Sequence, residues 1–198
     1  MSHQHFIIHK PYGYLSQFVC ELKKKKLLGD LHDFPEGTMA IGRLDEESEG
    51  LLLLTTDGKM SELVRSKKVE KEYYAQVDGI ITDDAIAQLQ QGVEIGIRDV
   101  KYQTTPCTAF KLEKAPEFAP RTRKIRDDRH GPTSWVSITL TEGKNRQVRK
   151  MTAAVGFPTL RLLRVRVGAI HLHDLPPGDV IELDSFYLPQ QQEEVELL

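Results

Sequence analysis

The sequence has few of the residues that mark a chain for an oxidising compartment or a membrane. Its 198 residues include only two cysteines, Cys20 and Cys107, which stand far apart and outside any CxxC pair. This argues against a disulfide framework and a thiolate zinc site. The chain also lacks an apolar run of the roughly 20 residues that a spanning helix needs, and its amino terminus lacks the features of a secretory signal. We therefore expect a cytoplasmic protein without membrane contact.

The chain also lacks an overall excess of one charge. Its 27 basic and 29 acidic residues give a formal net charge of -2, which by itself argues against a nucleic-acid partner. The segment from Arg121 to Arg166, however, holds 12 Lys or Arg against three acids, a local charge of +9, so the rest of the chain sums to -11. Such a basic surface is typical of a phosphate-rich partner, because neutralising phosphates releases counterions. On charge alone, the alternative is a solvated face of a neutral protein.

Local patterns predict a chain that mixes strands with short helices. A composition of 39% hydrophobic and 28% charged residues is typical of a globular protein, and 198 residues are enough for one ordinary domain or for two small lobes that share a core. Capping residues and apolar spacing predict helices after Asp57, from Thr82 to Gly92 and from Asn145 to Val155. We expect a long basic loop at 113–132. We expect a first strand that ends near residue 10 and a half-buried strand at 136–141. The other expected strands lie at 39–44, 50–58, 73–77, 100–104, 108–112 and 160–167.

Cations gather on the last helix and on the strand that follows it. At about 100° per residue, Val148 and Met151 share an apolar face of the helix, while Arg146, Arg149 and Lys150 gather on the other side. In the strand at 160–167, arginines alternate with valines, which adds a second set of cations with a defined direction. We therefore expect both elements to present positive charge to a partner.

The residues with chemical potential are an acid, an aromatic and their basic neighbours. Asp45 lies in a glycine-bounded turn two positions after Arg43, and an Arg beside a carboxylate favours its ionised form, which can act as nucleophile or base. Tyr73, two positions after Lys71, could stack on an unpaired base. Each residue also has a plain structural explanation, as a turn residue or a half-buried strand aromatic. The residues alone therefore indicate a nucleic-acid protein with a candidate active acid, but no reaction.

Three ordered motifs give the chain a family resemblance. After HKPYG, the segments GRLDEESEGLLLLTTDG, KEY at 71–73 and EGKNRQVRKM resemble the motifs of the RsuA/RluE branch of pseudouridine synthases, and the match runs from about Ile7 to Leu183. PTSW and the stretch EGKNRQVRKMTAAVGFPTLRLLR are most similar to the RluE subfamily, which modifies a uridine in large-subunit (23S) ribosomal RNA. The resemblance implies an α+β fold with a mixed, mostly antiparallel sheet in two lobes, flanking helices and a central cleft. It also implies isomerisation of uridine without cofactor or metal.

The resemblance assigns roles to residues at matching positions. It implies that Asp45 is the catalytic aspartate, that Tyr73 stacks on the target base and that Arg149 pairs with the carboxylate of this aspartate. It implies that Arg43 helps to displace or replace the flipped nucleotide and that Lys71 is structural or contacts the RNA backbone. The local charge extends the expected RNA contacts to the basic loop and the basic helix. These further RNA-binding candidates are Arg126, Arg129, Lys144, Asn145, Arg146 and Lys150.

The resemblance also predicts the organisation and the partner. We expect a catalytic domain at residues 1–188, without a separate N-terminal RNA-binding domain, and an acidic tail at 189–198. The expected partner is large-subunit ribosomal RNA or an assembly intermediate, bound by a monomer. Two alternatives remain: an RNA-binding assembly factor that has lost the reaction, and a metal-dependent nuclease. The seven histidines have no acidic or thiolate partner at metal-ligand spacing, so we expect no metal.

Overall fold

The computed structural model describes residues 3–65, 69–126 and 128–186, so the predicted domain boundary and acidic tail lie outside it. None of the helices in these ranges has the length and apolar character to cross a membrane. The helices are α1 (Gly58–Arg65), α2 (Asp83–Gln91) and α3 (Gln147–Ala154), with 3-10 turns at Leu28–Asp30 and Asp128–His130. The strands are β1 (His5–Lys10), β2 (Met39–Ala40), β3 (Glu49–Thr55), β4 (Lys71–Asp78), β5 (Glu94–Ile97), β6 (Val100–Gln103), β7 (Thr108–Lys111), β8 (Thr133–Leu140), β9 (Thr159–Val167), β10 (Ile170–His171) and β11 (Val180–Leu183).

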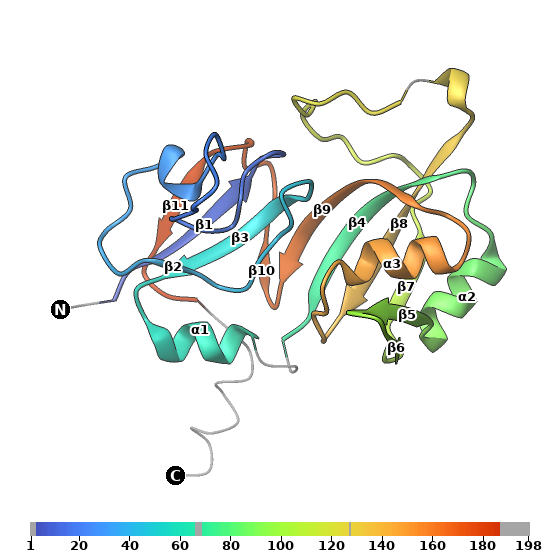
Figure 1. Ribbon diagram of the computed structural model, residues 1–198, viewed down its shortest axis with the longest axis horizontal. Coiled ribbons are helices and arrows are strands. Elements are labelled where there is room, and N and C mark those ends of the chain that lie inside the picture. Colours follow the sequence, from blue (N-terminus) through green and yellow to red (C-terminus); the bar gives the residue numbers. More distant parts are fainter. Residues whose placement is uncertain (1–2, 66–68, 127, 187–198) are drawn as a thin grey trace, which may run out of the picture.

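One mixed sheet runs through the molecule in the order β11-β1-β3-β9-β4-β8-β7, with β2 and β10 at its sides and a separate β5-β6 hairpin. Its two halves, β11-β1-β3 and β9-β4-β8-β7, form the left and right parts of Figure 1. Every pairing except that of β3 with β9 is antiparallel. The structure therefore has the mixed, mostly antiparallel sheet in two lobes that the resemblance implies.

In the first half, both faces of the sheet are covered, which explains the run of four leucines in β3. Leu51 and Leu53 pack in one cluster with Ile7 and Val64 of α1, whereas Leu52 and Leu54 belong to a second cluster with Leu28. Successive side chains of a strand point to opposite faces, so a strand covered on both faces is apolar throughout.

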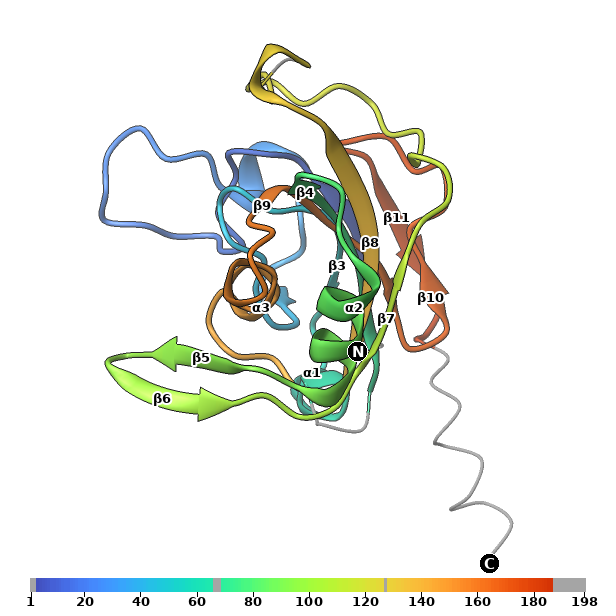
Figure 2. The ribbon, with the colours of Figure 1, turned by 90° about the vertical axis from the view of Figure 1, so that its right-hand side faces the viewer.

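In the second half, α2 and α3 lie on one face of the sheet formed by β4, β8 and β9 (Figure 2). Thr82 caps α2 by accepting a hydrogen bond from the Ala85 amide, and Gly92 ends it, as predicted. Helix α3 buries Val148 and Met151 against the sheet, also as predicted. It begins at Gln147 rather than Asn145, because Arg146 has a left-handed backbone with φ of 52°.

The two halves meet where β3 and β9 pair in parallel through only two residue pairs, Glu49 with Leu163 and Gly50 with Arg164. Gly50 has φ of +104°, and a Cβ atom there would lie 2.3 Å from the Arg164 carbonyl oxygen. A glycine is required at this position because it permits both the backbone conformation and the close approach.

Two sequence predictions about burial are wrong. Strand β8 is not half-buried: Ser137, expected on its open face, is fully buried and donates a hydrogen bond to Glu72. The arginines of β9 do not form an outward set of cations either. Arg164 is buried and donates to the Leu51 carbonyl, and Arg166 is bound to Glu70 and Glu72.

Candidate active site

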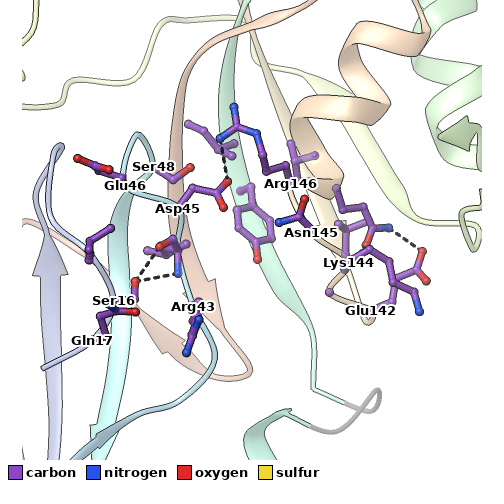
Figure 3. A pocket seen from close by; sticks show the side chains of 18 residues that line it. Ser16, Gln17, Arg43, Asp45, Glu46, Ser48, Glu142, Lys144, Asn145 and Arg146 are labelled. Carbon is purple, nitrogen blue, oxygen red and sulfur yellow. Dashed lines mark hydrogen bonds and ion pairs between the residues drawn. The ribbon is translucent and has the colours of Figure 1, made fainter. Parts of the chain in front are cut away.

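A cavity of about 550 Å³ opens where the two halves of the sheet meet, and we call it the main cavity. Its volume lies within the range of about 300–1,000 Å³ that is usual for small-molecule sites. One wall comes from the 43–48 turn and residues 15–17, and the other comes from the segment before α3 (Figure 3). Tyr73 also lines the main cavity. Of the predicted site residues, the main cavity brings together Arg43, Asp45, Tyr73, Lys144, Asn145 and Arg146.

Backbone contacts hold the turn that carries Asp45. The buried Ser16 hydroxyl donates to the Leu44 carbonyl at 2.8 Å and accepts from the Leu44 amide at 2.9 Å. The Gly13 amide donates to the Glu46 carbonyl at 2.8 Å, and the Ser48 amide donates to the Asp45 carbonyl at 3.0 Å. The HKPYG segment and the residues just after it thus fix the turn on both sides of Asp45. Its carboxylate is left partly exposed and points across the main cavity toward Arg146 (Figure 3).

The cation that pairs with Asp45 is Arg146, and not Arg149 as the resemblance implies. Nη1 of Arg146 lies 3.7 Å from Oδ2 of Asp45, and Nη2 lies 3.1 Å from the Glu47 carboxylate. The left-handed backbone of Arg146 is uncommon for a residue with a Cβ atom, and such conformations gather at functional sites. Arg149 instead donates to the Glu47 carbonyl at 3.0 Å and to the Ser48 hydroxyl at 3.3 Å.

A buried carboxylate, Glu142, holds the loop that delivers Arg146. It accepts hydrogen bonds from the Tyr102 hydroxyl at 2.5 Å, the Thr105 amide at 2.9 Å and the Gln147 side chain at 2.6 Å. These bonds lower the pKa of Glu142 although burial opposes the shift. Gln147 also accepts from the Lys144 amide at 2.9 Å. Residues 143–146 are therefore tied at both ends, a role that sequence reasoning did not assign to the EG of EGKNRQVRKM.

Tyr73 stands at the boundary between the two halves, where it packs against a hydrophobic cluster of each. Tyr73 also lines a second cavity of about 310 Å³, which we call the side cavity and which Arg43 and Lys71 line as well. Burial, aided by the charge of Arg164, lowers the pKa of Lys71 to about 8. Arg43 is exposed and lines both cavities.

The remaining predicted RNA-binding residues lie outside the main cavity. Arg126 forms an ion pair with Asp78, so a carboxylate already offsets its charge. Arg129 is exposed in the 3-10 turn of the basic loop and lines none of the described cavities, and Lys150 donates to Asn145 on the helix surface. Arg126 and Arg149 line a third cavity, of about 290 Å³, behind the 45–48 turn.

Lys10 is a buried cation beneath the site that the sequence did not single out. Its ammonium group donates to the carbonyls of Pro11 and Tyr14 at 3.0 and 2.7 Å, and no part of the residue is exposed. Burial lowers the pKa of Lys10 to about 7, although Glu49, Asp45 and Glu46 oppose the shift. The only sequence signal was an unexplained Lys at the end of an apolar strand.

The described residues include no group of three His, Cys, Asp or Glu side chains placed to hold a metal ion. The polar groups of the main cavity are instead three carboxylates, three cations, three amides and two serine hydroxyls, besides Tyr73; the carboxylates are Asp45, Glu46 and Glu142, and the cations are Arg43, Lys144 and Arg146. Such a set can bind a phosphate-bearing ligand and apply a carboxylate to it.

Comparison with known proteins places these motifs in a family. The profile described as RNA pseudouridylate synthase matches residues 4–154. The chain is 42% identical over 174 residues to ribosomal large subunit pseudouridine synthase E of Xanthomonas campestris, covering 87% of this chain and 91% of that protein. It is 41% identical over 179 residues to the protein of the same name in Vibrio vulnificus, covering 89% and 74% of the two chains.

Solved structures agree with the sequence comparison. A crystal structure of a pseudouridylate synthase matches with a TM-score of 0.70 and 28% identity, over 98% of this chain and 73% of that one. The resemblance predicted from the motifs, and the α+β fold that it implies, are therefore confirmed over most of the chain.

Proposed function

Because the chain belongs to the RNA pseudouridylate synthase family, we propose that it isomerises a specific uridine of large-subunit ribosomal RNA to pseudouridine, with Asp45 as the catalytic acid and without a cofactor. The names of the relatives in Xanthomonas and Vibrio support this substrate class. The observation that carries the mechanism is the main cavity, in which the Asp45 carboxylate lies 3.7 Å from Arg146 beside Tyr73.

The reaction requires the uridine to leave the base stack, because its glycosidic bond is otherwise inaccessible. Extrusion costs about a few kcal/mol and is offset by stacking and backbone contacts in the pocket. Tyr73 offers an aromatic face to the extruded base, and Arg43, exposed at the mouth, is placed to fill the space that the base leaves. Lys71 contacts the RNA from the side cavity.

The chemistry breaks one bond to the ribose and makes another. Asp45 acts either on the ribose C1′ or on the pyrimidine ring, which assists cleavage of the N1–C1′ bond. The uracil then turns and C5 bonds to C1′. Any bond to Asp45 breaks, C5 loses its proton to Tyr73 or a water, and N1, which no longer carries the ribose, gains a proton, so the product is an isomer of the substrate. Arg146 orients the Asp45 carboxylate throughout.

The RNA reaches this site over a cationic approach. Lys144 and Asn145 line the main cavity beside Arg146, and Lys144 is held 4.6 Å above the Tyr102 ring. Lys150 and Arg129 extend the positive surface along α3 and the basic loop.

The test is a pseudouridine map of ribosomal RNA from cells with and without the protein, followed by conversion in vitro. Wild type should convert one large-subunit uridine, on naked RNA or on an assembly particle. Asp45→Asn should bind the RNA with similar affinity and convert none. Asp33→Asn, the same change at an exposed acid away from the main cavity, should convert normally.

Each rival function gives a different result. If wild type binds RNA tightly but forms no pseudouridine on any ribosomal RNA, the protein is a non-catalytic RNA-binding factor. If it cuts the strand and a chelator stops it, the protein is a metal-dependent nuclease. Either outcome would overturn the proposal.

A further inference from the structure

The cavity of about 290 Å³, which we call the arginine cavity, shares a wall with the main cavity. The shared wall is the 45–48 turn: Asp45, Glu46 and Ser48 line the main cavity, and Glu47 lines the arginine cavity. Arg146 spans this wall through its contacts with Asp45 and Glu47. A ligand that enters the main cavity and continues beyond its mouth can therefore reach the arginine cavity across one turn of backbone.

The arginine cavity holds far more positive than negative charge. Its lining contains one carboxylate, that of Glu47, and five cations. Asp78 compensates one cation, Arg126. Within residues 3–65, 69–126 and 128–186, the other four form no ion pair with a carboxylate. These four are Arg121, Arg123, Lys124 and Arg149.

Three of these cations are held in place by neutral groups. Arg121 stacks 4.7 Å from the centre of the Tyr12 ring and donates to the Arg123 carbonyl at 2.7 Å. Arg123 in turn donates to the Tyr12 hydroxyl at 3.3 Å. Arg149 is held by the Glu47 carbonyl and the Ser48 hydroxyl. Such fixed guanidinium groups lose little freedom when they bind an anion.

The protein does not satisfy all of these donors. The Nε atoms of Arg126 and Arg149 are buried and find no acceptor among the described residues. Burial lowers the pKa of Arg121 and of Arg149, and neighbouring arginines act in the same direction on both. Crowded like charges with surplus donors are unfavourable in the free protein, and an anion would relieve them.

We propose that the arginine cavity binds a backbone phosphodiester of the RNA strand adjacent to the flipped uridine. Arginine is suited to this because its planar guanidinium donates two parallel hydrogen bonds to a phosphate. A phosphate contact fixes register without reading sequence, so this site holds the strand while the main cavity holds the base. The inference rests on the proposed function, because it takes the uridine in the main cavity as its starting point.

The experiment uses a double-mutant cycle between the protein and the RNA backbone. Arg123→Gln/Lys124→Gln removes the two cations of the arginine cavity that are most exposed, and neither residue belongs to the main cavity. The RNA is a large-subunit fragment containing the target uridine, with one neutral methylphosphonate at each flanking linkage in turn. Binding is measured in the Asp45→Asn background, so that the substrate is not converted.

We expect the double variant to bind unmodified RNA about tenfold more weakly than the parent protein. The slope of log K against log salt should fall by about 0.7 for each phosphate that the variant no longer neutralises. At one linkage, the methylphosphonate should lower the RNA affinity of the parent protein severalfold and leave the affinity of the double variant nearly unchanged. The control is Lys111→Gln/Lys114→Gln, the same charge change at exposed lysines outside the arginine cavity. It should respond to the methylphosphonate as the parent does.

Three results would overturn the proposal. In the first, every methylphosphonate weakens both proteins equally; in the second, the control loses as much affinity as the double variant. In the third, inorganic phosphate protects Arg123 from a guanidine-modifying reagent while the RNA does not, which would make the cavity a free-anion site. Failure of the proposed function is distinguishable, because it appears as absence of pseudouridine with the wild-type protein on every ribosomal RNA, whereas failure of this inference appears as one of the three results above with a protein that does convert its uridine.

Discussion

The buried pair of Glu49 and Arg161 provides a sharp test of what joins the two halves of the sheet. Arg161 on β9 donates from Nε and Nη2 to the Glu49 carboxylate on β3, at 3.0 and 2.8 Å. The two side chains are 7% and 2% exposed, respectively. The pair bridges the strands that meet in the short parallel pairing, next to the turn that carries Asp45.

Removing one partner should be strongly destabilising. Glu49→Gln leaves the Arg161 charge buried without a counter-charge, which costs about 3–5 kcal/mol in comparable cases. In a domain of this size, 1 kcal/mol shifts the melting temperature by about 2–4 °C, so a decrease of roughly 6–20 °C is expected. Glu49→Gln/Arg161→Met should recover part of this loss, because it removes both buried charges together.

The control is an exposed ion pair with the same heavy-atom distance. Glu94 and Lys101 lie 2.8 Å apart in the β5-β6 hairpin, with side chains 55% and 83% exposed. Glu94→Gln should cost about 0–1 kcal/mol, since such pairs are screened by solvent. Urea and thermal unfolding of all variants measure the difference. If Glu49→Gln and Glu94→Gln prove equally stable, burial is not what gives the β3-β9 bridge its energy, and the reasoning is refuted.

Two further predictions concern residues around the main cavity. Burial lowers the pKa of Lys10 to about 7, so the unfolded chain, with a pKa near 10.5, binds more protons between these values. Stability should therefore rise with pH from about 7 to 10 relative to Lys10→Met, and parallel urea midpoints across that range would contradict this. Glu142→Gln should displace the loop carrying Arg146 and lower kcat/KM about 10–100-fold. Release of the C5 proton measures this rate, and an unchanged rate would show that the loop holds its place without the Glu142 charge.

The elements that the sequence predicted well are those specified by local pattern. Thr82 and Gly92 bound α2 because capping depends on neighbouring residues. The valine and methionine face of α3 packs inward because helical spacing alone sets it. The glycine-bounded turn around Asp45 was likewise visible in the sequence, and the motif order then connected it to Tyr73.

The predictions that failed concern partners distant in the chain. Arg161 meets Glu49, and Arg166 meets Glu72, across more than 90 residues, so a pattern within one strand could not reveal that these charges are internal. The exchange of Arg149 for Arg146 beside Asp45 has a different cause. The resemblance assigns the partner of Asp45 by position in a motif, and this position does not report the left-handed backbone that places Arg146 outside α3.

The narrow junction at Gly50 also bears on how such a protein can evolve. Most members of each hydrophobic cluster come from one half of the sheet, although Val167 of β9 packs in a cluster of the first half and Tyr73 packs on a cluster of each. Compensating substitutions away from these shared residues can therefore accumulate within one half while the other stays constant. Distant sites change stability independently, whereas the reacting groups depend on contacts across the junction: the pairing of β3 with β9, the Glu49–Arg161 ion pair and the bonds of Arg146 and Arg149 to the 45–48 turn. Lineages are therefore free to diversify loops far from this junction, provided that the contacts across it are preserved.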